Sequence, residues 1–474
     1  MKIIRGRGAV TKNGRFIFPK DGYLTKDELN GFIDYNYNHL LPKYRENMKM
    51  YLGKHDILDK DPIDFGPDNR LVVNKAKQIV DTFNGYFIGI PPSISLEKGS
   101  NNDELQSWLN HVSFMDKLNE LSKQTDIYGK SIGFVYQNET AETRFNYVSP
   151  TKAFIIYDDT IEHNPLAFVR YEFYDNQSQW QARGKIYYAE AIYDFDKESI
   201  DYNAKPNPYK LVPAVEFYEN EERQGIFDQV KTLINALDNA YSQKANQLDY
   251  FDIAYLVMMG IRLPENKKTG KPNIDIVRNR LLYLPNVTPG TNPKVEFLSK
   301  PSDDGMQENF IKHLTDEIYN ISMIQNLNDE KFAGNASGIA LKYKMLLMQD
   351  KAKSKQRKFI QSLRNLFRII FSVGQVIPES AHNAWEDLQI NFTLNVPDDV
   401  ASMISAAKDA EGLVSKRTQL KLLPGIVDDP DDEIKQMEKE KQDSIKDAQQ
   451  AAGSLPDYMK QIDYMKQSDS DDQK

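Results

Sequence analysis

The sequence predicts an α+β protein, and three observations carry this prediction. Hydrophobic residues make up 40% of the 474 residues and charged residues 27%, which suits a chain that folds in water, either as two to four domains or as one elaborate subunit. Apolar residues recur at helical spacing in the first third of the chain and again after residue 225. Between these stretches, short aromatic and β-branched runs alternate with polar turns, which is typical of an antiparallel sheet.

Helices are expected first along the chain. A helix should begin directly after Thr25, because Thr25 and Glu28 have the spacing of a capping box. The segment NRLVVNKAKQIVDTFNGYFIG predicts a buried amphipathic helix that extends to about Asn84, and two more helices are expected near 102–112 and 115–128. Nothing in residues 1–24 indicates regular structure, so they are interpreted as an N-terminal arm.

The runs SIGFVYQ, FNYVSP, AFIIYD, AFVRYEFYD and KIYYAEAIYDFD predict the strands of the sheet. Residues 25–224 therefore form one predicted α+β domain. A later run, HNAWEDLQINFTLN, predicts one or two strands that return to this sheet.

Two helices then bracket an insertion. The first is predicted over 225–251 and the second over 305–324, and the intervening 252–304 reads as a small strand-and-helix insertion rich in proline, glycine and asparagine. The apolar stripe of the first helix consists of Phe227, Val230, Ile234, Leu237 and Tyr241.

A glycine-punctuated loop at 325–340 precedes a long basic helix within 341–395. Its segment from Lys342 to Arg368 contains nine basic residues and one acid, Asp350, whereas the whole chain has a formal net charge of −9. The nine are Lys342, Lys344, Lys351, Lys353, Lys355, Arg357, Lys358, Arg364 and Arg368. Helices are expected again over 396–452, with a cap at Asp429 before Pro430, and residues 453–474 read as a disordered acidic tail.

No catalytic, cofactor or metal site emerges from the sequence. The chain has no cysteine, and its six histidines are dispersed without metal-ligand spacing. The tripeptide GKS in YGKSIG belongs to phosphate loops, but Gln124 stands where that motif needs a glycine, so a structural turn at Lys130 is the preferred interpretation. Acidic pairs at predicted helix starts are interpreted as caps. No apolar run reaches the length of a membrane span, and the N-terminus lacks the apolar segment of a secretion signal.

The order of these elements resembles the portal proteins of tailed double-stranded DNA bacteriophages, of the type found in phages of Gram-positive hosts. Four stretches within residues 69–440 carry the resemblance: NRLVVNKAKQIVDTFNGYFIGIPP, VPAVEFYENEERQGIFDQVKTLINALDNAYSQKAN, FAGNASGIALKYKMLLMQDKAKSKQRKFIQSLRNLF and LVSKRTQLKLLPGIVDDPDDEIKQMEKE. The third, with its G-x-A-S-G-x-A-L-K-Y-K core, is the most specific.

The resemblance implies a ring of twelve copies at one capsid vertex, through which DNA enters and leaves. It also implies an α/β wing, a two-helix stem, a small clip, a tunnel loop followed by a long helix, and a helical crown. The wing would be 25–224 with 341–395, which contains the long helix, and the stem would be 225–251 with 305–324. The clip would be 252–304, the tunnel loop 325–340 and the crown 396–452. The implied partners are double-stranded DNA, the terminase large subunit, a head-completion or adaptor protein, scaffold and the major capsid protein. The implied location is the virion, after assembly in the host cytoplasm.

The resemblance also implies roles for single residues. The stripe from Phe227 to Tyr241 would contact neighbouring subunits, and Gly334 and Gly338 would be hinges of the tunnel loop. The DNA-contacting residues would be Lys331, Asn335, Ser337, Lys342 and Lys344. Each phosphate contact adds binding energy, so a wholly basic channel would hold DNA too tightly, and a restricted basic contact on an acidic body avoids this. The alternative for the basic helix is a solvated face, or pairing with acids of a neighbouring subunit.

Three other classes of function can be weighed on the residues. A membrane-surface protein could use a basic amphipathic helix, but the acidic body opposes anionic lipid. A nuclease needs a carboxylate or histidine cluster, which the sequence does not show. A non-enzymatic oligomeric scaffold or adaptor that binds nucleic acid or partner helices stays open, although it does not predict the helix–insertion–helix–loop–helix order. Rings with a central hole in electron micrographs would separate the portal interpretation from this alternative.

Overall fold

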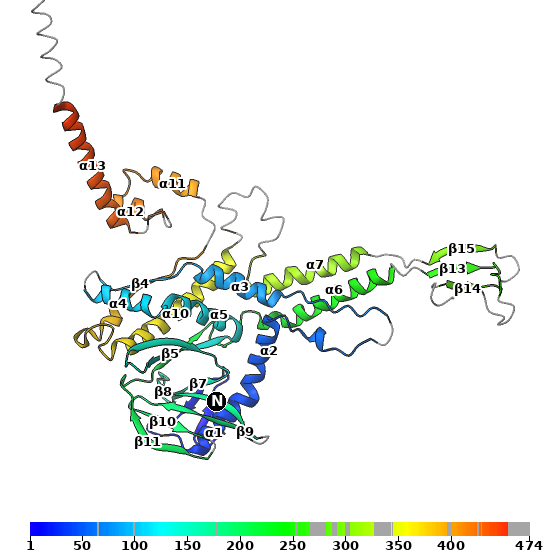
Figure 1. Cartoon of the computed structure of the whole chain (residues 1–474), viewed down its shortest axis with the longest axis horizontal. Coiled ribbons are helices and arrows are strands. Elements are labelled where there is room, and N and C mark those ends of the chain that lie inside the picture. The colour runs from blue at the N-terminus through cyan, green and yellow to red at the C-terminus, as the bar shows by residue number, and fades with distance from the viewer. Residues whose placement is uncertain are drawn as a thin grey trace, which may run out of the picture. The chain divides into compact units, whose positions relative to one another are not determined.

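Helices and strands are mixed along most of the chain in the computed structural model (Figure 1). The structure describes residues 1–63, 66–97, 100–176, 179–196, 198–251, 255–265, 281–286, 292–298, 304–326, 343, 345–395, 400–423, 426–427 and 429–453. The described residues up to 395 form one compact unit, and those from 400 to 453 form a second. In neither unit is a described helix both long and apolar enough to cross a lipid bilayer.

The main sheet of the first unit has eight strands in the order β1-β2-β3-β7-β8-β9-β10-β11. The strands are β1 (Lys2–Arg5), β2 (Gly8–Val10), β3 (Phe16–Phe18), β7 (Ala153–Asp158), β8 (Pro165–Asn176), β9 (Gln179–Tyr187), β10 (Ala191–Phe195) and β11 (Ile200–Pro206). All neighbours pair antiparallel except β3 and β7, which run parallel. The antiparallel pairing that the aromatic runs predict is confirmed for β7 to β10.

The N-terminal residues differ from the prediction. The first ordered element is β1, not the helix after Thr25, and three strands within residues 1–24 belong to the main sheet. β3 lies beside β7, with Phe16 opposite Ile156, and both side chains are buried. Strands of three or four residues are too short to leave a clear period-2 pattern, so the sequence showed only an arm.

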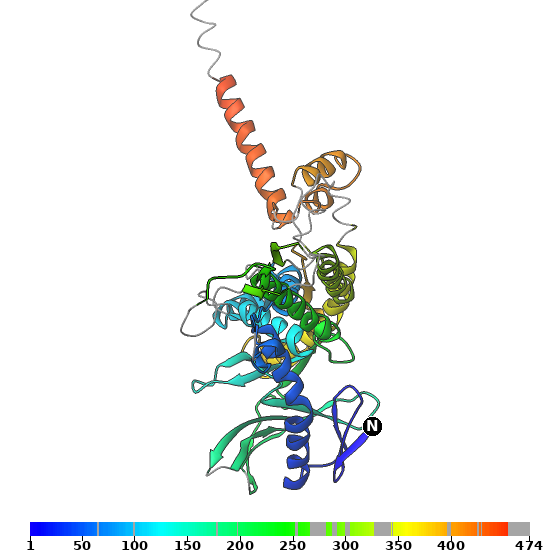
Figure 2. The same ribbon diagram turned by 90° about the vertical axis from the view of Figure 1, so that its right-hand side faces the viewer.

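Both faces of the main sheet are covered. α1 (Lys26–Tyr35) lies on one face of the sheet (Figure 2). Its Phe32 packs there in a buried core with Phe16 and Phe154. On the other, Ile155 and neighbouring side chains pack against a three-stranded sheet in the order β12-β5-β6. Its strands are β5 (Lys130–Gln137), β6 (Thr143–Val148) and β12 (Ala214–Tyr218). Successive side chains of a strand point to opposite faces, so consecutive apolar residues in β7 serve both cores.

Two helices cover the three-stranded sheet. α5 (Phe114–Tyr128) contacts β5 and β6, and α10 (Leu346–Phe371) contacts β12 and β5. Three further helices pack on α5, namely α2 (Leu41–Tyr51), α3 (Lys75–Ile88) and α4 (Ser100–His111). The capping box of α1 is confirmed, because the Glu28 amide donates to Thr25 Oγ1 and the Thr25 amide donates to Glu28 Oε2.

The predicted helix–insertion–helix order is confirmed. α6 (Lys231–Phe251) and α7 (Asp304–Ser322) pack against each other, and the strands β13 (Tyr255–Met259), β14 (Leu281–Leu284) and β15 (Lys294–Leu298) lie between them in the chain. These strands form a sheet in the order β14-β13-β15, with β13 and β14 parallel. α6 and α7 are named the hairpin below, and β13 to β15 the small sheet.

The strand predicted in HNAWEDLQINFTLN is present but does not return to the main sheet. β16 (Gln389–Asn391) pairs antiparallel with β4 (Ser93–Ser95) in a separate two-stranded sheet. β4 has only three residues, which are too few to show a strand pattern in the sequence, so this pairing could not be predicted.

The second unit contains α11 (Val400–Asp409), α12 (Lys416–Leu420) and α13 (Pro430–Gly453). Arg417 of α12 pairs with Asp431 of α13 at 2.9 Å. The predicted cap of α13 is confirmed, because the amide of Asp431 donates to Asp429 Oδ1 at 2.8 Å. The expected acidic tail beyond residue 453 lies outside the described residues.

Candidate functional site

The candidate site is built on α10, the helix that carries most of the basic segment. One side of α10 is apolar and packs on β12 and β5, with Phe359, Leu363 and Leu366 fully buried. Among the basic side chains of α10, Lys353 and Arg357 are exposed, whereas Lys355 is buried. Two of the nine, Lys342 and Lys344, lie outside the described residues.

Lys355 is the centre of a buried ionic cluster. Its ammonium lies 2.5 Å from Asp126 Oδ1, 3.8 Å from Glu219 Oε2 and 2.9 Å from the hydroxyl of Ser122. The same nitrogen lies 4.7 Å from the ring centroid of Phe87, so aromatic faces complete its surroundings. Lys355 and Asp126 have no exposed side-chain surface. This lysine is therefore a structural anchor of α10 and is not available to DNA.

In this cluster the carboxyl groups of Asp126 and Glu219 face the single ammonium of Lys355. One cation cannot neutralise two carboxylates, so the protonated form of one acid is favoured. Burial raises the pKa of Asp126 well above its ordinary value; Lys355 opposes this shift, and Glu219 adds to it. Asp126 Oδ2 and Glu219 Oε2 are both buried without a hydrogen-bond partner. A proton on the Asp126 carboxyl would relieve the repulsion between the two acids.

Other basic residues of α10 also find partners in their own chain. Lys358 pairs with Glu221, and Lys351 lies 3.9 Å from Glu219 Oε1. Arg364 donates to the carbonyls of Glu386 and Leu388 at 2.7 and 3.1 Å. The guanidinium of Arg368 lies over the ring of Trp385.

These contacts change the interpretation of the basic helix. Neither a wholly solvated face nor pairing with a neighbouring subunit describes it, because Lys355 and Lys358 hold acids of the same chain. Lys353 and Arg357 are exposed and have no ion pair with any described residue. They are one helical turn apart, so they form a small basic patch on α10.

The GKS tripeptide is part of a second buried network. Lys130 lies 3.4 Å from Glu216 Oε2, and Arg223 donates to Glu216 Oε1 at 2.9 Å. Burial by itself would raise the pKa of Glu216, but Lys130 and Arg223 outweigh it, so the pKa is lowered. Gly129 ends α5 with φ +84°, and a Cβ there would lie 2.4 Å from the backbone of Arg223. The structure therefore explains both residues without a nucleotide.

The apolar stripe of the predicted stem helix requires a correction. Phe227, Val230, Ile234 and Leu237 are completely buried within the chain itself, and Phe227 and Val230 precede α6. Only Tyr241, with 36% of its surface exposed, could reach a neighbouring copy. The stripe is covered because the helix packs on the body of its own subunit, which periodicity alone does not reveal.

The polar side of α6 holds an extended segment of the chain. Asp238, Ser242 and Asn246 are spaced four residues apart and accept hydrogen bonds from three backbone amides. The donors are the amides of Val73, Leu71 and Asn69, at 2.7, 2.9 and 2.7 Å.

Asp238 also binds the imidazole of His55. Its Oδ2 lies 2.5 Å from His55 Nδ1, and His55 Nε2 lies 2.9 Å from the carbonyl of Met50. Both ring nitrogens face acceptors, which favours the imidazolium form. Burial by itself lowers the pKa of His55, but Asp238, Met50 and Asn74 outweigh it and raise the pKa. The polar face of α6 is thus a structural element that its sequence pattern did not indicate.

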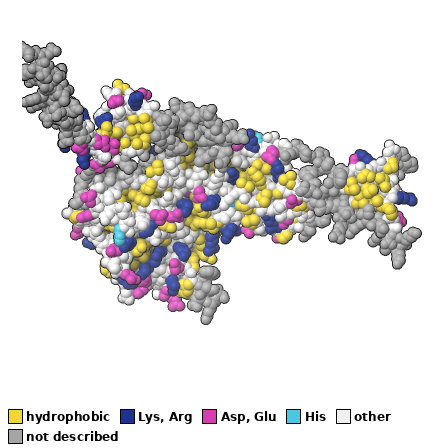
Figure 3. Space-filling view, turned by 45° about the horizontal axis from the view of Figure 1, so that its top comes forward, with side chains coloured by type: hydrophobic (Ala, Val, Ile, Leu, Met, Phe, Trp, Pro, Cys, Tyr) yellow, Lys and Arg dark blue, Asp and Glu magenta, His cyan; other side chains and the backbone are white. Residues whose placement is uncertain are grey.

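Apolar side chains remain exposed elsewhere on the hairpin and the small sheet. On the hairpin they include Tyr241, Leu248, Phe310 and Ile321, and on the small sheet Leu282, Leu284 and Val295. Figure 3 shows a patch of apolar side chains over the small sheet. Contiguous exposed apolar surface of this kind is typical of protein–protein contacts.

Of the predicted tunnel loop, residues 327–340 lie outside the described residues. This applies to the expected DNA contacts Lys331, Asn335 and Ser337 and to the expected hinges Gly334 and Gly338. In the part of the chain that is described, no group of three or more histidine, aspartate or glutamate side chains could hold a metal ion.

Comparison with known proteins identifies relatives along most of the chain. The sequence model of the family described as "Phage portal protein, SPP1 Gp6-like" matches residues 30–447. The portal protein of Bacillus phage SPP1 is 24% identical over 393 residues, which cover 77% of this chain and 74% of the relative. The portal protein of Clostridium phage phiCD119 is 22% identical over 411 residues, which cover 80% of this chain and 88% of the relative.

Proposed function

Because the chain belongs to the SPP1 Gp6-like family of phage portal proteins, we propose that its segments are the parts of a portal subunit. As a member of this non-enzymatic family, it is a virion component involved in DNA packaging at the capsid. The proposed parts are the wing (25–224 and 341–395), the stem (225–251 and 305–324), the clip (252–304), the tunnel loop (325–340) and the crown (396–452). We add residues 1–24 to the wing, because β1 to β3 belong to the main sheet.

Membership of the family implies an oligomeric ring with phage partners. We infer twelve copies around a channel for double-stranded DNA at one capsid vertex, after assembly in the host cytoplasm. The clip would receive the terminase large subunit during packaging and a head-completion or adaptor protein afterwards. Scaffold and major capsid protein would contact the wing.

We place part of the contact between subunits on the exposed apolar side chains of the hairpin. Tyr241 and Leu248 are seven residues apart on one face of α6, and Phe310 and Ile321 share one face of α7. In a cyclic ring, each subunit contacts its two neighbours through two different patches. We propose that α6 supplies one of these patches and α7 the other.

The proposal for how the channel contacts DNA depends on one observation: lysines of α10 form ion pairs with acids of their own chain. Lys355 and Lys358 hold carboxylates of their own chain, so the charge of α10 largely stabilises the wing. A ring multiplies every phosphate contact, and a wholly basic channel would therefore bind DNA tightly. We infer that few positive charges per subunit touch DNA: Lys353 and Arg357 are candidates on α10, and Lys331, Lys342 and Lys344 are candidates near the tunnel loop.

Electron microscopy of the purified full-length chain tests this function. The proposal expects end-on rings with a central hole. A chain that stays monomeric at high concentration, with its folded structure intact, would argue against the ring and the channel together.

A further inference from the structure

A cavity of about 560 Å3 lies between β12, the loop from β7 to β8, and α10. We propose that it binds a carboxylate side chain of an acidic peptide segment from a partner protein. The cavity is named the Arg15 cavity, and the polar or aromatic residues that line it include Arg15, Tyr157, His163, Gln361, Asn365 and Arg368. This inference does not depend on the ring or on DNA.

Arg15 is the first observation. Its guanidinium lies 5.5 Å from the ring centroid of Tyr157, and its Nε is buried without an acceptor. Its side chain has no hydrogen bond or ion pair with any of the described residues. By contrast, Arg7 holds Glu28 and Arg223 holds Glu216. A buried guanidinium donor without an acceptor costs free energy, and a ligand oxygen would remove that cost.

The charge around the cavity is the second observation. Glu216 lines it, but this carboxylate is already held by Lys130 and Arg223. Glu162 at the rim accepts a hydrogen bond from Asn164. Arg15 also contributes to the lowered pKa of Glu216, so Lys130, Arg223 and Arg15 share this one carboxylate. Arg368 has no ion pair with a described residue, and this excess of positive charge favours an anionic ligand.

The size and lining of the cavity favour a peptide over a small ion. Its volume lies in the range of pockets that take organic ligands, and apolar side chains such as Val212 and Ile369 form part of the wall. The amides of Gln361 and Asn365 can both donate and accept, as peptide groups require, and neither has a hydrogen-bond partner among the described residues. Arginine is the side chain best suited to bidentate binding of a carboxylate.

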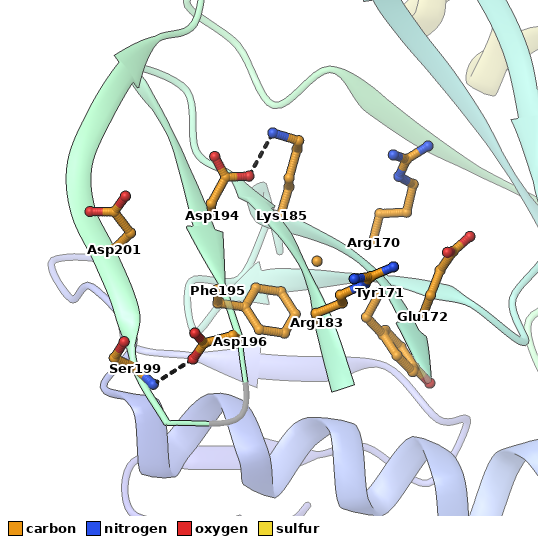
Figure 4. Close-up of a pocket in the computed structure, with 11 residues that line it drawn as sticks. Arg170, Tyr171, Glu172, Arg183, Lys185, Asp194, Phe195, Asp196, Ser199 and Asp201 are labelled. Atoms are coloured by element: carbon orange, nitrogen blue, oxygen red, sulfur yellow. Dashed lines mark hydrogen bonds and ion pairs between the residues drawn. The ribbon is translucent and has the colours of Figure 1, made fainter. Parts of the chain in front are cut away.

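A second cavity, of about 470 Å3 on the main sheet, does not share these properties (Figure 4). Part of its charge is satisfied within the cavity: Lys185 pairs with Asp194 at 2.6 Å, and Asp196 accepts a hydrogen bond from the amide of Ser199. Arg183 lies over Tyr174. The Arg15 cavity is the stronger candidate because the Nε of Arg15 is buried without an acceptor, whereas no described residue that lines the second cavity has such a buried atom.

Isothermal titration calorimetry of the full-length chain with an acetylated and amidated tetraglutamate peptide tests the proposal. Tetraglutamine and inorganic phosphate are the comparison ligands. We expect tetraglutamate to bind, and Arg15→Ala to weaken this binding roughly tenfold or more, the loss expected for one charge-assisted hydrogen bond. Arg15→Lys should restore only part of the affinity, because it keeps the charge but not the planar donor pair.

Arg45→Ala is the matched control. Arg45 also lies over a tyrosine ring, that of Tyr37, but it does not line the cavity, so its loss should leave the affinity unchanged. If Arg15→Ala does not fold, Arg368→Gln replaces it in the titration, because Arg368 is on the exposed side of α10. This variant should also weaken the binding of tetraglutamate. The proposal is overturned by absence of tetraglutamate binding, by equal affinity for tetraglutamine, by equal binding of phosphate, or by equal weakening in Arg45→Ala.

Discussion

The ammonium of Lys355 lies 2.5 Å from Asp126 Oδ1, and neither side chain has any exposed surface. This contact joins α10 to α5 inside the first unit, with Glu219 as a second acid nearby. It shows that the most buried charge of the basic helix serves the fold of its own subunit.

Replacing Lys355 by methionine should therefore destabilise the first unit. The change leaves two buried carboxyl groups without their cation, and breaking a buried ion pair in this way costs about 3–5 kcal/mol. The measurement is the free energy of unfolding in urea. Lys353→Met, two residues away and exposed, is the control and should stay within about 0.5 kcal/mol of the parent chain.

The double variant Lys355→Met with Asp126→Leu refines this test. It removes an acid along with the cation, so it should be more stable than Lys355→Met alone. A single Lys355→Met variant as stable as the parent would show that the cluster does not hold α10 in place.

Stability should depend on pH through His55. Its folded-state pKa is raised, so the stabilisation by Asp238 is fully present below the unfolded value of about 6.5 and is lost as the pH rises through the folded value. Unfolding midpoints in urea across this range should therefore fall with rising pH. His55→Asn should be less stable at low pH and should flatten this part of the profile, whereas an unchanged slope would place the titration on another group.

The hairpin provides a test of assembly. Tyr241→Glu and Phe310→Glu each place a charge on an exposed apolar side chain, so the subunit should stay folded while ring formation falls. Ring yield by size-exclusion chromatography with light scattering, beside circular dichroism, measures both effects. Gln243→Glu, exposed on α6, is the control and should assemble normally.

Ile234→Asp gives the opposite expectation. This side chain has no exposed surface, so an aspartate there should impair folding of the subunit itself. Normal rings from both Tyr241→Glu and Phe310→Glu would contradict the assignment of the exposed faces to subunit contact.

Much of the fold could be predicted from local patterns. The cap at Thr25 and Glu28, the aromatic strands and the two helices around an insertion depend on spacing within one segment, and the structure confirms them. The resemblance to portal proteins rested on the same order of elements, and the family comparison confirms it.

What could not be predicted depends on contacts between distant segments. Lys355 and Asp126 are 229 residues apart, so no spacing rule joins them. A signal did exist, because Ser122 and Asp126 lie four residues apart on a buried side of α5. Likewise, the stripe from Phe227 to Leu237 was correctly seen as apolar, but periodicity does not say whether a helix buries its stripe in its own subunit or in another.

We propose that a ring of this chain forms a DNA channel that touches DNA through few groups per subunit, on the tunnel loop and on α10. The most direct measurement is the length of DNA packaged per head, with ring yield determined in parallel, for Lys331→Glu and for Gly334→Pro with Gly338→Pro. We expect normal rings with empty or partly filled heads, and a salt-dependent defect for Lys331→Glu because phosphate contact is electrostatic. Full-length DNA packaged at the parental rate by both variants would show that the tunnel loop does not contact DNA during packaging.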